Sequence, residues 1–183
     1  MIYDYAFVKK PNWIQEYLVN PVLDVAMSFL DFHGFGIPLC IGICIVLMAM
    51  KKTRRYGYML LMALAISILL NYLIKIIIAR PRPFLEYNFS LLIDPPHSFS
   101  FPSGHTQQSF VVATILLFVN KKAGIVGYII AACIGFSRMY LLVHYPSDVL
   151  IGAILGIACG FFTRWLFNRF IKRSHNKNLF IGR

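Results

Sequence analysis

The sequence predicts an all-α protein, a polytopic bundle of about five transmembrane helices preceded by a short N-terminal helix. Of its 183 residues, 58% are hydrophobic and only 14% are charged, and the mean hydropathy is +0.68. A soluble domain of this size needs more charge on its surface. The charged residues also stand in short clusters between long uncharged runs, which is the pattern of a multi-pass membrane protein.

The N-terminal part differs from the rest of the chain. Residues 1–20 mix polar and aromatic side chains without the apolar core of a signal peptide, so we interpret them as an interfacial arm. Residues 22–32 are mostly apolar but include Asp24 and Asp31, and a spanning helix needs about 20 residues. We therefore expect an interfacial or re-entrant helix there. The bundle has six spans if this helix crosses the membrane with both acids facing the protein.

Five longer apolar runs follow, and most of them stop at basic clusters or at proline. The second run stops at Pro81 and Pro83, because proline cannot continue a helix. The last run contains Gly152, Gly156 and Gly160, whose spacing of four permits close helix packing. We assign residues 21–170 to one transmembrane domain and residues 171–183 to a basic cytoplasmic tail. The predicted spans are 35–50, 56–78, 104–120, 125–142 and 149–167.

The basic clusters predict the topology. The cluster at 51–55, the pair Lys121-Lys122 and the basic tail are separated by even numbers of spans, so all lie on one side, which the positive-inside rule makes cytoplasmic. We therefore predict a multi-pass protein of the cytoplasmic membrane in which loop 80–105 and turn 143–148 meet at the external face. The same rule explains the net charge of +11 without a nucleic-acid partner.

Loop 80–105 ends in Pro102-Ser103-Gly104-His105, directly before an apolar run. Ser103 suits a helix N-cap, and the unpaired N–H groups of a first helical turn favour an anion. His105 adds a titratable group, although alone it can be an ordinary polar residue at a helix start.

Several basic residues accompany this loop. Lys75 and Arg82 are seven residues apart and share one helix face if the second helix persists that far. Singly, Lys75 can snorkel toward the interface, and Arg80 and Arg82 can anchor it. Arg138 lies inside the fourth span, where a charge is costly and usually faces a polar pocket.

Turn 143–148 contains His144 and Asp148, four residues apart. Ser147 can cap the fifth helix, and Asp148 suits its first turn through the helix dipole, which is a purely structural role. Alternatively, the carboxylate orients the imidazole of His144 and stabilises its cation.

Together on one face, these residues predict phosphoryl transfer. Fixed cations and helix N–H groups hold a phosphate, and two histidines supply a nucleophile and an acid for the leaving oxygen. This set is sufficient without a metal or another cofactor, and the face shows no carboxylate cluster for magnesium. Four cysteines lie within apolar runs and lack the spacing of a zinc site: Cys40, Cys44, Cys133 and Cys159.

The pattern resembles the membrane-bound type 2 phosphatidic acid phosphatases, also called lipid phosphate phosphatases. Their three signatures match in order and spacing over residues 75–148, and the first signature selects Arg82 over Arg80. The matching residues are Lys75 with Arg82-Pro83, Pro102-Ser103-Gly104-His105, and Ser137-Arg138 with His144 and Asp148.

The resemblance implies a role for each residue and a reaction without a metal ion. His144 attacks phosphorus to form a phosphohistidine, Asp148 orients its ring, and His105 protonates the leaving oxygen and then activates water. The phosphate oxygens are held by Lys75, Arg82, Ser103, Gly104 and Arg138.

The small size resembles bacterial members of the family, which favours undecaprenyl diphosphate as the substrate at the external leaflet. Phosphatidylglycerophosphate, or a broad range of lipid phosphates, is the alternative.

A non-catalytic lipid-binding or transport protein predicts loss of a histidine, and both are present. An ion channel predicts its histidines and acids within the spans. Soluble vanadium-dependent haloperoxidases share such a site, but the spans argue against that activity. The expected partners are a lipid phosphate and membrane lipids, and the oligomeric state stays open.

Overall fold

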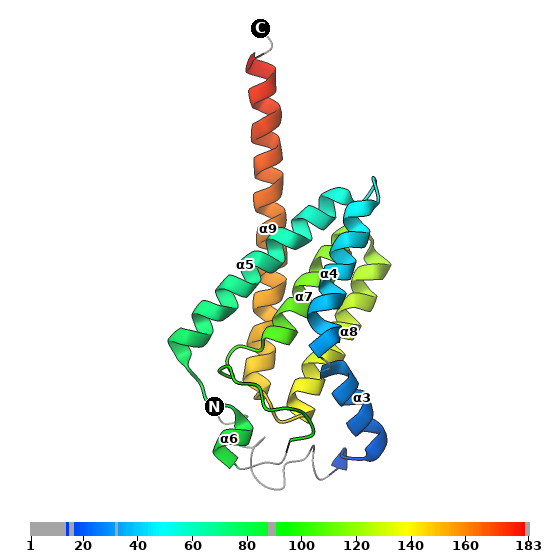
Figure 1. The fold of residues 1–183 in the computed structure, drawn as a ribbon. Coiled ribbons are helices and arrows are strands. Elements are labelled where there is room, and N and C mark those ends of the chain that lie inside the picture. The colour runs from blue at the N-terminus through cyan, green and yellow to red at the C-terminus, as the bar shows by residue number, and fades with distance from the viewer. Residues whose placement is uncertain (1–13, 15–16, 32, 88–90, 182–183) are drawn as a thin grey trace.

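The computed structural model describes residues 14, 17–31, 33–87 and 91–181, and this part of the chain is helical without strands (Figure 1). The predicted all-α fold is therefore confirmed. The helices are α3 (Pro21–Asp31), α4 (His33–Ala49), α5 (Arg54–Ile78), α6 (Pro83–Tyr87), α7 (Gly104–Val119), α8 (Lys121–Tyr140) and α9 (Pro146–Ile181).

Each of the five predicted spans corresponds to one helix of the structure, namely α4, α5, α7, α8 or α9. The segments of α5, α8 and α9 are long and apolar enough to cross a membrane, whereas α4 and α7 are shorter apolar helices. The number of spans therefore stays a prediction. Helix α3 has 11 residues, as short as expected for an interfacial helix.

Helix α7 is the centre of the bundle and packs against α4, α5, α8 and α9. Helix α5 runs diagonally across the bundle, and the C-terminal part of α9 extends beyond the other helices (Figure 1). The first turns of α7 and α9 lie at the same end of the bundle as the last turn of α8. This arrangement brings loop 80–105 and turn 143–148 together, as the charge pattern predicted.

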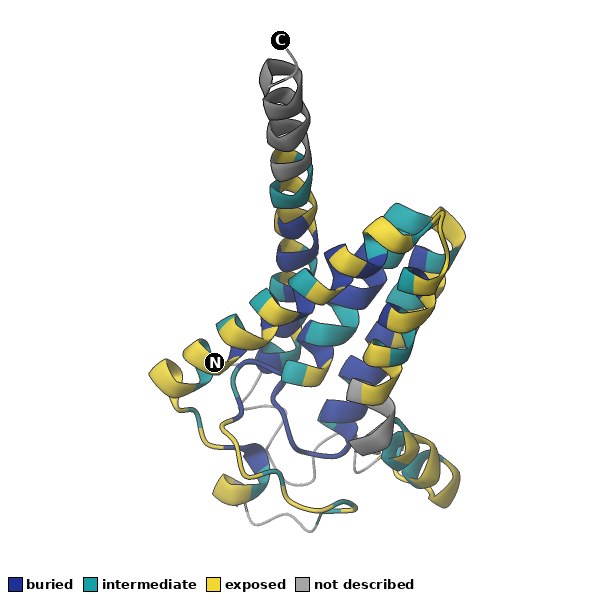
Figure 2. Cartoon of the chain, turned by 45° about the horizontal axis from the view of Figure 1, so that its top comes forward, coloured by how far each residue is buried: buried dark blue, intermediate teal, exposed yellow. Residues whose placement is uncertain are grey.

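The distribution of burial is that of a protein surrounded by lipid (Figure 2). Large apolar side chains such as Leu69 and Ile77 of α5 are exposed, whereas polar side chains are buried between α5 and α7. Asn71 Nδ2 donates to Gln107 Oε1 at 2.8 Å, and Gln107 Nε2 donates to Ser67 Oγ at 2.9 Å. Because each buried polar group needs a partner where water is absent, this network holds the two helices together.

The glycines of α9 lie directly against α7. A Cβ atom at Gly156 would lie 2.3 Å from the carbonyl oxygen of Gln107, and one at Gly160 would lie 2.6 Å from Thr114 Cγ2. The predicted close packing along the glycine stripe is therefore confirmed.

One helix boundary agrees with the sequence prediction and another differs from it. Helix α5 ends at Ile78, with Ala79 in the left-handed conformation at φ 47°, because Pro81 bars its continuation. The second helix therefore does not persist to residue 82, so the condition under which Lys75 and Arg82 would share one helix face is not met. Helix α9 continues past residue 167 to Ile181, since no proline or glycine interrupts residues 161–181.

The N-terminal region is anchored on α8. The Tyr140 hydroxyl donates to Asp24 Oδ1 at 2.6 Å, so this acid of α3 faces the protein. Ile14 is fully buried next to Tyr140 and Leu141. Most of the predicted interfacial arm, residues 1–13 and 15–16, lies outside the described residues.

The glycine stripe predicts a difference between two glycine-to-alanine variants. Gly156→Ala is expected to lower the stability by about 1–3 kcal/mol, because a methyl group there overlaps the α7 backbone. Gly42→Ala in α4 is the matched control, since its Cβ has no neighbour within 4 Å, and it should be neutral or stabilising by up to about 1 kcal/mol. Thermal unfolding in detergent measures both, and equal melting temperatures would contradict the packing.

Candidate active site

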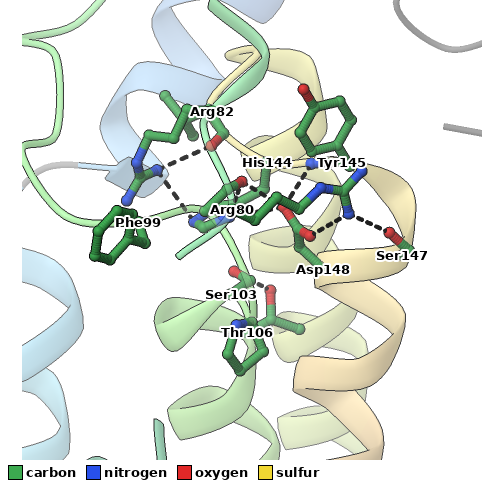
Figure 3. A network of polar contacts seen from close by, with 12 residues as sticks. Arg80, Arg82, Phe99, Ser103, Thr106, His144, Tyr145, Ser147 and Asp148 are labelled. Atoms are coloured by element: carbon green, nitrogen blue, oxygen red, sulfur yellow. Dashed lines mark hydrogen bonds and ion pairs between the residues drawn. The ribbon is translucent and has the colours of Figure 1, made fainter. Parts of the chain in front are cut away.

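The site lies where loop 80–105 meets the turn between α8 and α9 (Figure 3). The backbone N–H of Ser103 donates to the carbonyl oxygen of Asp148 at 3.1 Å. Arg82 Nη1 donates to the carbonyl oxygen of Val143 at 2.9 Å. These contacts join segments that are far apart in the sequence.

The chain reverses sharply before His144 and holds this residue between two helices. After α8, Leu142 takes a left-handed conformation at φ 57°, and the N–H groups of Val143 and His144 both donate to the carbonyl oxygen of Arg138. Helix α9 then begins at Pro146, where a missing N–H costs nothing. The His144 side chain is only 3% exposed.

Asp148 has both of the roles that the sequence left open. As the third residue of α9, it accepts at Oδ2 from the N–H of Tyr145 at 3.0 Å, which is half of a capping box. The same Oδ2 lies 3.5 Å from His144 Nδ1. Ser147 lies inside the first turn of α9 and its hydroxyl accepts from Arg80, so the expectation that Ser147 caps this helix is wrong.

The contacts of His144 define which nitrogen holds the proton. Nδ1 faces the carboxylate of Asp148 and lies 3.4 Å from Ser100 Oγ, whereas Nε2 lies 3.4 Å from Arg82 Nη1. Because a carboxylate only accepts and a guanidinium only donates, Nδ1 is protonated and Nε2 has the lone pair. Nε2 is therefore the ring atom that is able to act as a nucleophile.

Burial lowers the pKa of His144 below its usual 6.5. The hydrogen bond to Asp148 opposes this shift, and the positive charges of Arg82 and Lys75 add to it. The imidazole is therefore neutral near pH 7, the form in which a ring nitrogen has a free lone pair.

The basic residues divide into two groups. Arg82 donates from Nε to the carbonyl oxygen of Ser98 at 2.6 Å, and Lys75 donates to the carbonyl oxygen of Phe99, so both bind the same loop. Arg138 is buried at the end of α8, where its Nη2 donates to Ser137 Oγ at 2.8 Å.

The first turn of α7 places the remaining predicted residues. Ser103 is the N-cap residue by position, but its side chain makes no cap hydrogen bond and Oγ accepts from Thr106 Oγ1 at 2.9 Å. Its expected capping by the side chain is therefore wrong. Gly104 lies close to α5, since a Cβ there would be 3.3 Å from Asn71 Oδ1. His105 follows and is exposed, and its role as the acid stays a prediction.

Two residues of the site were missed by the sequence analysis. Arg80 forms an ion pair with Asp148 at 2.8 Å, although the motif spacing had set it aside. Ser100 is fully buried and its hydroxyl donates to Asp148 Oδ2. Both residues lie in loop 80–105, which the sequence predicted to meet the turn that contains Asp148. That position could have identified them as candidate partners of Asp148.

The fold and the site together define a membrane-bound phosphatase. The chain belongs to the PAP2 superfamily, whose model matches residues 55–172. It is 36% identical over 136 residues to an undecaprenyl-diphosphatase of Sulfolobus acidocaldarius, an alignment that covers 73% of this chain and 66% of that protein. It is 32% identical over 151 residues to undecaprenyl-diphosphatase BcrC of Bacillus subtilis, covering 82% and 76%.

A solved structure also shares the fold. The crystal structure of a transmembrane PAP2-type phosphatidylglycerolphosphate phosphatase from Bacillus subtilis matches with a TM-score of 0.72 and 28% sequence identity. The match covers 92% of this chain and 84% of that one.

The lowered pKa of His144 predicts a specific loss of stability in acid. The unfolded chain binds a proton at His144 below pH 6.5, whereas the folded protein does not until the pH is much lower. Folding is therefore weakened by up to about 1.4 kcal/mol per pH unit below 6.5. Melting temperatures from pH 7.5 to 5 should fall more steeply for the wild type than for His144→Gln. Parallel curves would show that this ring is not buried in its neutral form.

Proposed function

We propose that the protein hydrolyses undecaprenyl diphosphate to undecaprenyl phosphate and inorganic phosphate at the external face of the cytoplasmic membrane. The observation that supports this best is the buried His144, with Nδ1 facing Asp148 and Nε2 facing Arg82. The relatives named undecaprenyl-diphosphatase favour this substrate, and the charge pattern favours an external site.

The reaction has two steps. His144 Nε2 attacks the terminal phosphorus, and the bond between that phosphorus and the bridging oxygen breaks as the phosphohistidine forms. His105 gives its proton to the leaving oxygen and then takes a proton from the water that cleaves the phosphohistidine. Asp148 stabilises the positive charge that develops on the imidazole during attack.

The phosphate oxygens are held by cations and by helix N–H groups. Arg82 Nη1 is 3.4 Å from Nε2, so it reaches oxygens on the phosphorus under attack. Lys75 and Arg138 add positive charge, and the Ser103 hydroxyl and the Gly104 N–H add donors at the start of α7. Because phosphoryl transfer depends on positioning and charge, we propose a reaction that requires no metal.

Phosphatidylglycerophosphate is the second candidate substrate. The structural neighbour from Bacillus subtilis is named for that activity. Both lipids present a terminal phosphate to the same residues. Discrimination between the two substrates must therefore come from the rest of each lipid molecule.

Phosphate release from purified protein in detergent tests the substrate. The panel contains undecaprenyl diphosphate, phosphatidylglycerophosphate and phosphatidic acid, each with EDTA. We expect undecaprenyl diphosphate to be cleaved with the highest kcat/KM and the rate to survive EDTA. Equal rates on all three would instead indicate a broad lipid phosphatase, and a loss under EDTA that metal reverses would refute the metal-free mechanism.

The histidines are tested with three alanine variants. His144→Ala should lower kcat by at least about 10³-fold because it removes the nucleophile, and His105→Ala should lower it by about 10²–10⁴-fold because it removes the acid. His97→Ala is the control, since His97 is an exposed histidine of the same loop, and it should retain activity. Substantial turnover by His144→Ala in correctly folded protein rules out the nucleophile assignment.

A further inference from the structure

We propose that Arg80 is a positioning residue of the active site, which holds Asp148 and through it His144 in the orientation for attack. This inference rests on the proposed function for its kinetic consequences. Its geometric basis is independent of the substrate.

The ion pair with Arg80 is the close charge contact of Asp148. The carboxylate is fully buried, and such a group is stable only with a compensating charge and hydrogen bonds. The distance from Oδ1 to Arg80 Nη1 is 2.8 Å, whereas Oδ2 is 3.5 Å from His144 Nδ1. A normal N–H···O bond is about 2.7–3.2 Å long, so Arg80 provides the strong contact and His144 a weak one.

The Arg80 guanidinium is itself fixed by two further contacts. Its Cζ atom lies 3.7 Å from the centroid of the Tyr145 ring, a cation–π arrangement. Its Nη1 also donates to Ser147 Oγ at 2.8 Å. The side chain therefore binds three residues around the start of α9 (Figure 3), and this leaves Asp148 little freedom to rotate away from His144.

Arg80 also positions the second acceptor that faces His144. Its carbonyl oxygen accepts from the N–H of Ser100 at 2.9 Å. The Ser100 hydroxyl donates to Asp148 Oδ2 and lies 3.4 Å from His144 Nδ1, so it can accept the Nδ1 proton. The backbone of Arg80 thus positions Ser100, and its side chain positions Asp148, so that both face Nδ1 of His144.

Arg80 and Arg82 consequently have different tasks, although only Pro81 separates them. Arg82 lies at Nε2, where the phosphate reacts. Arg80 lies at the acid on the opposite edge of the imidazole. Loss of Arg82 should therefore weaken phosphate binding, whereas loss of Arg80 should slow the chemical step after the substrate has bound.

Steady-state kinetics separate these effects. Arg80→Ala should lower kcat by about 10–100-fold with KM within about threefold of the wild type, and Arg80→Lys should be intermediate because lysine keeps the charge but not the planar fork. Arg55→Ala is the matched control. Arg55 also lies over a tyrosine ring, at 4.9 Å from that of Tyr56, but at the other end of α5, and its loss should change neither constant.

Free guanidinium distinguishes positioning from a general effect on folding. Added guanidinium should restore part of the kcat of Arg80→Ala and should not accelerate the wild type or Arg55→Ala. A raised KM with unchanged kcat would mean that Arg80 binds substrate, and a loss of kcat without rescue in protein that melts earlier would mean a structural role. Either result would overturn the proposal, as would unchanged kinetics.

A measurement without substrate separates this proposal from the proposed function. In ¹⁵N-histidine-labelled protein, the His144 resonances are assigned by their loss in His144→Gln. We expect the tautomer with the proton on Nδ1 in the wild type and a mixture of tautomers in Arg80→Ala. If the wild type cleaves no lipid on the panel but the tautomers change, the proposed function fails and positioning stands. An unchanged tautomer in Arg80→Ala refutes positioning even in an active phosphatase.

Discussion

The buried carboxylate of Asp148 is the constraint on which the geometry of the site depends. A buried charge that loses its partner destabilises a protein by several kcal/mol, so the segments that supply its partners must fold around it. Arg80 and Ser100 bring loop 80–100 to this carboxylate, and the Tyr145 N–H attaches it to the turn. Its backbone carbonyl also accepts from Ser103. One residue of α9 thus joins loop 80–100, the turn that precedes α7 and the turn that precedes α9.

The packing below the site determines whether these partners can meet. Gly152 belongs to the stripe that lies against α7, and a Cβ there would lie 2.8 Å from the carbonyl oxygen of Ser103. A larger residue would separate α9 from the turn that precedes α7. On the other side of α7, Asn71 donates to the carbonyl oxygen of Pro102 as well as to Gln107, so α5 holds the same turn. The position of the Ser103–His105 turn is therefore set by backbone contacts with both neighbouring helices.

The sequence predicted what depends on composition and order, and it failed where individual side-chain contacts decide. Hydropathy and the basic clusters predicted the helices and the meeting of loop 80–105 with turn 143–148, because both follow from the membrane. Spacing selected His144, Asp148 and Arg82, and the structure brings these three residues together. The left-handed end of α5 at Ala79, the hydroxyl contact of Ser103 and the partner of Arg80 were not predictable. The Arg80 contact joins residues 68 positions apart, and no local pattern specifies it.

The environments of the two histidines separate their roles in the proposed reaction. His144 is enclosed, and burial keeps its ring neutral, so the lone pair on Nε2 is available before the substrate arrives. His105 is exposed in the first turn of α7, where protons can exchange with water between the two steps. Groups of one chemical type obtain opposite functions when their surroundings differ in this way. Burial also has an unfavourable consequence for His144, because its ring gains a positive charge away from water during attack. The carboxylate of Asp148 offsets that charge, provided that Arg80 and Ser100 keep it in place.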